Sequence, residues 1–202
     1  MKGSIRAVLA TSAALSLTAF GAAAPASATE NHKPKLTKQV GDWNKIDDTY
    51  KLPKGTACKD EVTVKEHAEA RDTVYTDKHG QVVKVFSEFK DWSTVKFSAT
   101  TKKHHKQVTR SVKLNQGGDA WARFKDEGKT VYVKAEGANW GQGSGIYGIP
   151  WSYGDISFTV VHADGSDYRI VNLDLSEAKK VKQVCYLIGS KPVWGKNVPP
   201  PA

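Results

Sequence analysis

The stretch TVYTDKHGQVVKVFSEF, from Thr73 to Phe89, decides the fold class. It places two runs rich in valine, phenylalanine and threonine on either side of the tetrapeptide Asp77–Gly80. β-Branched and aromatic residues favour strands, and Gly80 accepts the positive φ angle of a tight turn between antiparallel strands. The stretch therefore predicts a β-hairpin.

Similar runs fill most of the chain, and turn residues recur about every ten positions. The predicted strands cover residues 61–66, 73–76, 81–89, 93–100, 108–114, 120–124, 130–136, 155–161 and 167–175. Short connections favour pairing between sequential strands. We therefore expect an all-β fold, an antiparallel meander of about eight or nine strands closed as a barrel or as a sandwich, because either arrangement protects the sheet edges.

Little helix is expected, and residues 176–188 are the one candidate. Ser176 has the side chain of a helix cap, and several apolar residues that follow share one helical face. The end of this segment, VCYLI at residues 184–188, also reads as a final strand. We expect a short helical turn that passes into a strand.

The first residues predict export. Lys2 and Arg6 precede an uncharged apolar run over residues 7–23, and a small-residue cleavage motif ends at Ala28. This is the pattern of a secretory signal peptide covering residues 1–28. No later segment is apolar enough over sufficient length to span a membrane, so we expect a secreted, extracellular protein.

Composition divides the rest of the chain into three parts. Residues 29–54 are polar and lysine-rich and predict a flexible leader, within which residues 40–46 could dock locally. Residues 55–190 hold the predicted strands and form one β domain, which we expect to be monomeric. Residues 191–202 form a Pro-rich tail that cannot continue a strand.

The chain has two cysteines, Cys58 and Cys185. In an exported protein an even number of cysteines predicts disulfide bonding, and here one pairing exists within the chain. Neither cysteine lies in a C-x-x-C pair or beside a histidine, which argues against a reactive thiol.

Several short motifs give the chain a resemblance. They are Cys58 followed by VTV at 62–64, TDKHG at 76–80, VTRSV at 108–112, HADGS at 162–166 and VCYLI at 184–188. With the Ala-rich leader, this pattern resembles small, functionally uncharacterised secreted proteins of actinobacteria (Streptomyces-type) that carry a single-disulfide β domain. The resemblance implies a fold and a location, and it implies no activity.

The chain is basic, with 30 Lys and Arg against 21 Asp and Glu and a formal net charge of +9. Lysine greatly outnumbers arginine, which favours diffuse attraction to anions over bidentate reading of bases. We therefore expect no nucleic acid partner; candidate partners are an anionic cell-wall polymer, a glycan or a small apolar ligand. His104 and His105 would point to opposite faces of a strand, so no metal site and no cofactor are expected.

The segment GANWGQGSGIYGIPWSYGD, residues 137–155, interrupts the series of hairpins. Its large aromatic residues, Trp140, Tyr147, Trp151 and Tyr153, are the candidate ligand-binding residues, because sugars and flat apolar molecules stack on such rings. Aromatic residues beside glycine also close the ends of small β-folds. Both interpretations stay open at this point.

No residue is assigned a catalytic role. The sequence lacks the G-x-S-x-G elbow of acyl-transfer enzymes, and the paired carboxylates at 47–48 and 126–127 are chain neighbours in predicted loops. We expect a non-catalytic extracellular binding or interaction module. The alternative is an extracellular polymer hydrolase whose carboxylates are brought together from distant strands in a β-fold cleft.

Overall fold

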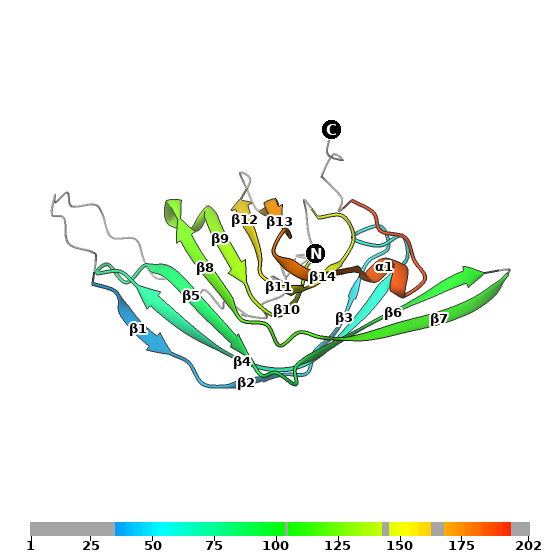
Figure 1. Cartoon of the computed structure of the whole chain (residues 1–202), viewed down its shortest axis with the longest axis horizontal. Helices are drawn as coiled ribbons and strands as arrows, with labels where there is room; N and C mark the ends of the chain where they lie inside the picture. The colour runs from blue at the N-terminus through cyan, green and yellow to red at the C-terminus, as the bar shows by residue number, and fades with distance from the viewer. Residues whose placement is uncertain (1–34, 104, 143–145, 163–167, 195–202) are drawn as a thin grey trace, which may run out of the picture.

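The computed structural model describes residues 35–103, 105–142, 146–162 and 168–194. The prediction of an all-β, antiparallel fold with little helix is confirmed (Figure 1). The strands are β1 (Thr37–Val40), β2 (Asn44–Ile46), β3 (Thr49–Leu52), β4 (Val62–Thr76), β5 (Val82–Phe89), β6 (Thr94–Lys103), β7 (Lys106–Asn115), β8 (Ala120–Lys125), β9 (Thr130–Ala135), β10 (Ala138–Trp140), β11 (Pro150–Gly154), β12 (Ile156–His162), β13 (Tyr168–Asp174) and β14 (Ala178–Gln183). A 3-10 turn (Asp126–Gly128) and helix α1 (Val184–Leu187) complete the described elements.

Strand β4 organises the molecule. It has 15 residues and merges two of the predicted strands, 61–66 and 73–76. Its first half pairs with β6, and its second half pairs with β5. Because β5 and β6 follow one another in the chain, they act as one long strand that is interrupted opposite the middle of β4. The chain passes from one side of this interruption to the other at four further places: between β7 and β8, β9 and β10, β11 and β12, and β13 and β14. We call the line through these crossing points the crease.

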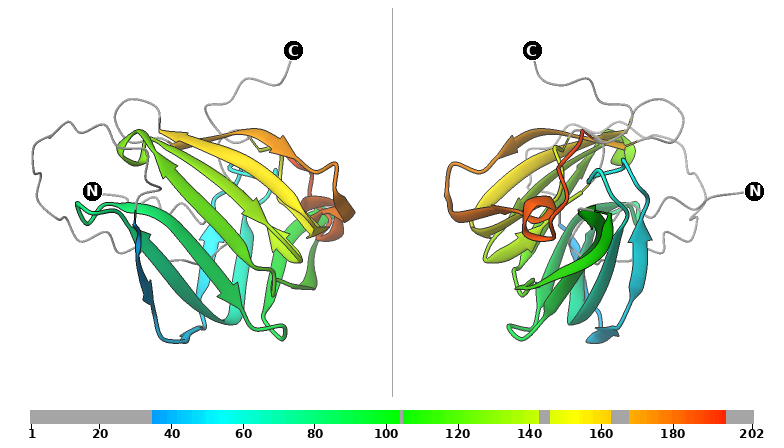
Figure 2. Two further views of the ribbon diagram at one scale, coloured as in Figure 1. Left: turned by 60° about the vertical axis from the view of Figure 1, so that its left-hand side comes forward. Right: turned by 90° about the vertical axis from the view of Figure 1, so that its right-hand side faces the viewer.

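The two sides of the crease have different architectures. On one side, β13, β12, β9, β8, β5 and β4 form a single curled sheet, which we call the open half (Figure 2). On the other side, which we call the sandwich half, strands β3, β4, β6 and β7 face a second sheet of order β10-β11-β14. Buried residues from both sheets, among them Val64, Phe97, Trp140 and Trp151, make up one core cluster between them.

The predicted closure into a barrel is wrong. The main sheet is an open, curled half-barrel that ends in β13 at one edge and β7 at the other. The reason is the course of the chain beyond the crease, where β10, β11 and β14 pair among themselves instead of adding to β7. The second predicted arrangement, packing of two sheets, is present in the sandwich half alone.

The crease requires glycine where two chain segments meet. Gly118 lies between β7 and β8, and a Cβ atom there would come within 2.7 Å of the carbonyl oxygen of Ala138 and still closer to Glu136 O. Gly137, on the facing segment, has a φ of 80°. Only a residue without a side chain fits at such an approach of two backbones.

The end of the predicted flexible leader is regular structure, which differs from the sequence analysis. Strands β1, β2 and β3 pair in succession along one edge of β4. This edge would otherwise present unpaired backbone groups over most of its length, and the leader covers it. Leu52 of β3 is buried in the sandwich core, and Ile46 of β2 packs at the crease.

The expected order of helix and strand at residues 176–188 is also wrong. Strand β14 comes first, and α1 follows it. The pairing of β14 with β11 satisfies its backbone, so the helical periodicity of the segment does not decide its conformation. Helix α1 then turns Val184 and Cys185 into the core.

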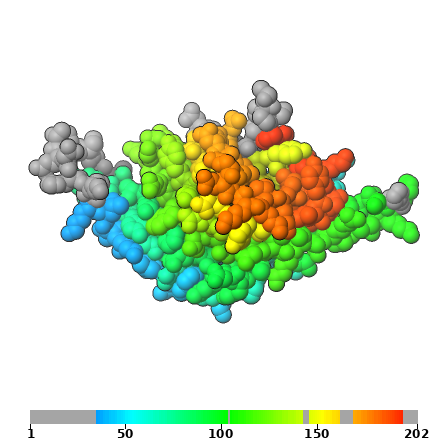
Figure 3. Space-filling model, in the orientation of Figure 1, coloured from blue at the N-terminus to red at the C-terminus, as the bar shows by residue number. Residues whose placement is uncertain are grey.

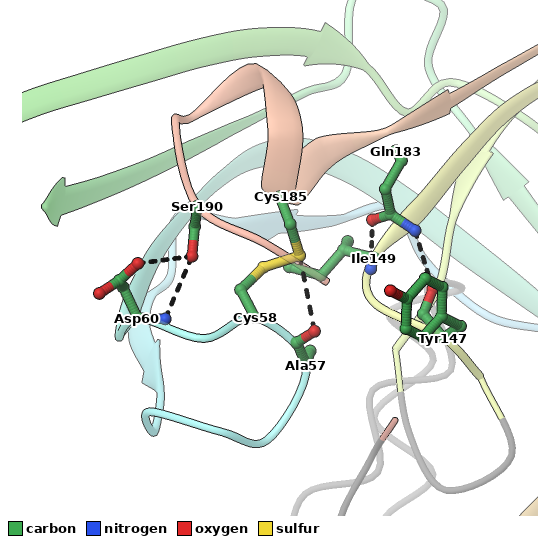
Figure 4. The surroundings of a disulfide bond; sticks show 8 residues. All are labelled: Ala57, Cys58, Asp60, Tyr147, Ile149, Gln183, Cys185 and Ser190. Atoms are coloured by element: carbon green, nitrogen blue, oxygen red, sulfur yellow. Dashed lines mark hydrogen bonds between the residues drawn. A yellow bond between two sulfur atoms is a disulfide. The ribbon is translucent and has the colours of Figure 1, made fainter. Parts of the chain in front are cut away.

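The predicted disulfide between Cys58 and Cys185 is confirmed, with Cα atoms 5.6 Å apart (Figure 4). It joins the segment before β4 to α1. Ser190 donates a hydrogen bond of 2.7 Å to the Asp60 carboxylate, and the backbone of Lys191 and Val193 pairs with residues 57–59. The start of the Pro-rich tail is therefore held beside the disulfide.

Among the described residues, no helix has the length and apolar character needed to cross a membrane. The predicted signal peptide and most of the HADGS motif, residues 163–166, lie outside the described residues.

Candidate functional site

The two tryptophans of the predicted ligand-binding segment lie in the core of the sandwich half. Trp140 is 3% exposed and Trp151 is 7% exposed. Trp140 Nε1 donates a hydrogen bond of 2.9 Å to Gln116 Oε1, and Trp151 Nε1 donates one of 2.7 Å to the carbonyl oxygen of Asn115. Phe97 meets the Trp140 ring edge to face at 4.9 Å. Both indoles therefore have their partners inside the protein.

The two tyrosines of the same segment face solvent. Tyr147 is 42% exposed and packs at 5.1 Å on the ring of Trp194. Tyr153 is 50% exposed on β11, opposite Lys180 of β14. The structure does not bring the four predicted rings together on one exposed surface, because β10 and β11 direct the indoles inward.

Gln183 fixes the backbone of this segment (Figure 4). Its Oε1 atom accepts a 2.8 Å hydrogen bond from the Ile149 amide, and its Nε2 atom donates one of 2.8 Å to the Tyr147 carbonyl oxygen. Gly148 lies between them with a φ of 73°, and a side chain there would collide with the Gln183 amide group. These contacts support the interpretation that residues 146–154 close the fold.

A different set of aromatic residues lies on the outer face of the open half. Tyr75 of β4, Lys84 of β5, Arg123 of β8 and Tyr132 of β9 are direct neighbours in one row across four strands. Residues in such a row point to the same face of a sheet. Phe86 and Trp121 form the next row on that face. We call these residues the platform: Tyr75, Lys84, Phe86, Trp121, Arg123 and Tyr132.

The platform lies on the face of the sheet that is opposite to the core. Val85, Val131 and Val133 alternate with its residues along β5 and β9, and they are buried on the inner face. Tyr132 is 44% exposed, Arg123 is exposed, and the other members are half-buried. A sheet fixes both the spacing and the direction of these side chains, which gives the platform a defined shape.

Cations and rings touch throughout the platform. Lys84 Nζ lies 3.6 Å from the centre of the Trp121 ring and 5.3 Å from that of Tyr75. Phe86 stacks on Trp121 at 4.1 Å, and Lys125 approaches Tyr132 at 5.0 Å. Within the described residues, Lys84, Arg123 and Lys125 form no ion pair with a carboxylate. Lys84 and Lys125 lie against aromatic rings instead, and all three cations are available to an anion.

The border of the platform at β4 contains an ion pair. Arg71 binds Glu88 through two hydrogen bonds of 2.7 and 3.0 Å, and this contact lowers the pKa of the Glu88 carboxyl group. Trp43, in the leader, packs against the Arg71 guanidinium at 4.8 Å and the Lys90 ammonium at 3.8 Å. The leader therefore supports the platform edge.

A polar pocket of about 300 Å³ lies at the opposite end of the platform, beside the crease. Its charged lining residues are Lys134, Asp155, Asp174 and Glu177. Lys134 Nζ lies 3.3 Å from Asp155 Oδ2 and 3.3 Å from Glu136 Oε1. The pKa of Asp174 is lowered because its carboxylate accepts hydrogen bonds from Ser176. A carboxyl group with a lowered pKa is a poor general acid at neutral pH.

The apolar crevice of the molecule is much smaller. Trp140, Ile146, Phe158 and Ile170 line part of it, and its volume is about 40 Å³. Sites for small molecules have volumes of roughly 300–1,000 Å³. The predicted small apolar ligand therefore gains no support from this crevice.

Sequence reasoning missed the platform because its members are distant in the chain. Strand register brings Tyr75, Trp121 and Tyr132 to one face of the sheet, and the sequence pattern does not give that register. A signal was present in each strand, where aromatic and basic residues alternate with valine and alanine, as in AWARFK at residues 120–125.

The platform contains no histidine. His105 is exposed in the turn between β6 and β7, and His104 lies outside the described residues. In the part of the chain that the structure describes, no three His, Cys, Asp or Glu residues are grouped to hold a metal ion.

Comparison with known proteins yields no match to a protein-family model, to a curated protein or to a solved structure.

Proposed function

We propose that this chain is an exported, non-catalytic binding module that holds an anionic glycan on the platform. The observation that carries the proposal is the row of Tyr75, Lys84, Arg123 and Tyr132 across four neighbouring strands. It places two neighbouring cations between two aromatic rings on a sheet face that the core does not use.

The chemistry of the row suits a sugar polymer with acidic groups. Aromatic rings such as Tyr132 offer apolar faces for the C–H side of a sugar ring and a hydroxyl group for its edge. Arg123 presents a planar fork that matches a carboxylate group, while Lys84 supplies a point charge. An uncharged glycan would leave these cations without a partner, so the platform favours an acidic one.

Secretion remains part of this proposal. The Cys58–Cys185 disulfide is the supporting observation, because such bonds persist in oxidising compartments outside the cytosol. A long extracellular polymer also suits an open sheet face, since a chain can lie across it without entering a cavity.

Titration calorimetry with uronic-acid oligosaccharides tests the proposal, with neutral dextran oligosaccharides as the comparison. We expect the acidic oligosaccharides to bind and the Tyr132→Ala and Arg123→Gln variants each to weaken binding by about tenfold, which corresponds to 1.4 kcal/mol. Tyr186→Ala is the matched control, because Tyr186 is an exposed tyrosine on α1. Equal binding by the Tyr132→Ala and Tyr186→Ala variants would refute the platform as the site.

A hydrolase acting on an extracellular polymer is the second candidate, because three carboxylates line the polar pocket beside the platform. This candidate requires one of them to be a general acid, and the lowered pKa of Asp174 makes Asp155 and Glu177 the residues to test. Release of reducing ends from acidic polysaccharides by the parent protein, and its loss in Glu177→Gln, would establish the hydrolase.

A further inference from the structure

We infer a second anion-binding site, independent of the platform, on the outer face of the sandwich half. It takes a linear polyol polymer joined by repeating phosphate diester groups, and not a nucleic acid. Lys65 of β4, Lys96 of β6 and Lys113 of β7 are direct neighbours in one row across three strands. We call these three residues the lysine row.

The lysine row lowers the stability of the protein when no ligand is bound. Like charges directly opposite one another destabilise a sheet. All three lysines are exposed, and within the described residues none of them forms an ion pair. Lys51, one row further along β3, has a carboxylate partner, since its Nζ lies 2.8 Å from Glu61 Oε1. The lysine row thus differs from Lys51 in placing three unpaired cations directly opposite one another on adjacent strands.

The sheet holds the row in a fixed geometry. Val64, Val95 and Leu114 alternate with the three lysines and are buried in the sandwich core. Neighbouring strands lie about 4.8 Å apart, so the row presents a positive charge at each strand spacing. A repeating polyanion laid across the strands meets one cation after another, whereas a single small anion meets one or two.

The neighbouring groups favour phosphate over an acidic sugar. Thr63, Ser98 and Ser111 form the next row on the same face and offer hydroxyl donors. Lysine ammonium groups are compact point charges with three rotatable donors, which suits tetrahedral phosphate oxygens approached from any side. Neither row contains an aromatic ring on which a sugar could stack, in contrast with the platform.

The strands of the row continue into a projecting arm. Strands β6 and β7 extend beyond the body of the molecule, as the ribbon and the space-filling view show (Figures 1 and 3). Lys102, Lys103 and Lys106 are exposed near its tip. By strand alternation Lys102 shares the face of the lysine row, whereas Lys103 and Lys106 are on the opposite face. The arm therefore adds Lys102 to the positive face, and the charge of all three residues increases the rate of association at low salt.

The test uses glycerol phosphate oligomers of increasing length, with glycerol 3-phosphate as the single unit, and measures affinity against salt concentration. We expect affinity to rise with length and then to level off. The Lys65→Gln, Lys96→Gln, Lys113→Gln triple variant should bind at least tenfold more weakly, with a log–log salt slope smaller by about 2, since each contact contributes roughly 0.7–0.9. It should unfold at a higher temperature than the parent, because the repulsion is gone.

The control is the Lys179→Gln, Lys180→Gln, Lys191→Gln triple variant, which removes the same charge from exposed positions elsewhere. An equal loss of affinity in both triple variants would reduce the effect to net charge and overturn the inference. Tighter binding of a thymidine oligonucleotide than of glycerol phosphate oligomers, or binding to phosphatidylglycerol vesicles alone, would also overturn it.

The proposals for the platform and for the lysine row can be refuted by different results. The Tyr132→Ala variant should retain glycerol phosphate binding, and the Lys65→Gln, Lys96→Gln, Lys113→Gln variant should retain uronic-acid binding. If the first variant loses the phosphate polymer, the two surfaces form one site and the independence of the lysine row is refuted.

Discussion

Lys84 places its ammonium nitrogen 3.6 Å from the centre of the Trp121 ring, the shortest such distance among the described residues. The two side chains come from adjacent strands, β5 and β8, and Phe86 stacks on the same indole at 4.1 Å. Trp121 is thus the central ring of the platform, in contact with both a cation and a second aromatic ring.

Removing this cation should have two effects. Lys84→Met is expected to change the tryptophan emission spectrum and to lower the free energy of unfolding by about 0.5–1 kcal/mol, the usual contribution of a cation–π contact near a surface. Fluorescence and urea unfolding measure both effects. Lys78→Met, at the exposed β4–β5 turn, is the control, and identical behaviour of the two variants would show that the contact contributes nothing.

The disulfide should contribute strongly to stability. Cys58 and Cys185 are 127 positions apart, and closing so long a loop stabilises the folded state by about 4–5 kcal/mol in the chain-entropy model. A variant with both cysteines changed to alanine should therefore melt at a clearly lower temperature than the oxidised parent. The reduced parent should behave like the variant, and an unchanged melting temperature in both would contradict a structural role.

The crease should not tolerate a side chain at Gly118. An alanine methyl group would meet the backbone oxygens of Glu136 and Ala138, so the backbone between β9 and β10 would have to shift. We expect Gly118→Ala to cost at least about 2 kcal/mol of unfolding free energy. Gly141→Ala is the control, because a Cβ atom there makes an ordinary contact of 3.5 Å with Ile146. Equal stability of the two variants in urea unfolding would show that the crease is not tightly packed.

The Arg71–Glu88 contact should make stability depend on pH in the acid range. The hydrogen bonds from Arg71 lower the pKa of Glu88 below 4.5, its value in the unfolded chain. The folded state therefore favours the charged carboxylate, so the contribution is complete above pH 4.5 and disappears as the pH falls through the lower folded-state pKa. Urea unfolding at a series of pH values should show a shallower acid loss in Glu88→Gln than in the parent. Glu127→Gln, in the exposed β8–β9 turn, should match the parent, and a parent-like slope for Glu88→Gln would refute the assignment.

The sequence predicted the strands better than their arrangement. Alternation of valine with polar residues located β5, β6 and β7 closely, because one face of each strand is buried against a core. The sequence could not predict the crease, since it depends on where β9 passes into β10 and on the fit between Gly118 and Gly137. It suggested local docking of residues 40–46, but the pairing of three leader strands with β4 could not be predicted, because that pairing is made by backbone groups.

The candidate binding residues show the same limit of prediction from sequence. The glycine- and aromatic-rich segment was conspicuous in the sequence, yet Trp140 and Trp151 are buried, and their N–H groups are bonded inside the protein. The platform and the lysine row use residues that look like an ordinary solvated face when each strand is considered alone. Only the register between strands aligns Tyr75 with Tyr132 or Lys65 with Lys113.

The leader strands have a further consequence for how copies of this chain meet. β1, β2 and β3 precede Cys58, so they lie outside the covalent ring that the disulfide closes, and backbone pairing along the 15-residue β4 holds most of their length. A leader that detaches uncovers a long acceptor edge without opening the ring. The leader of a second copy carries the backbone groups for the same hydrogen bonds, so exchange of leader strands between two copies would leave both rings intact.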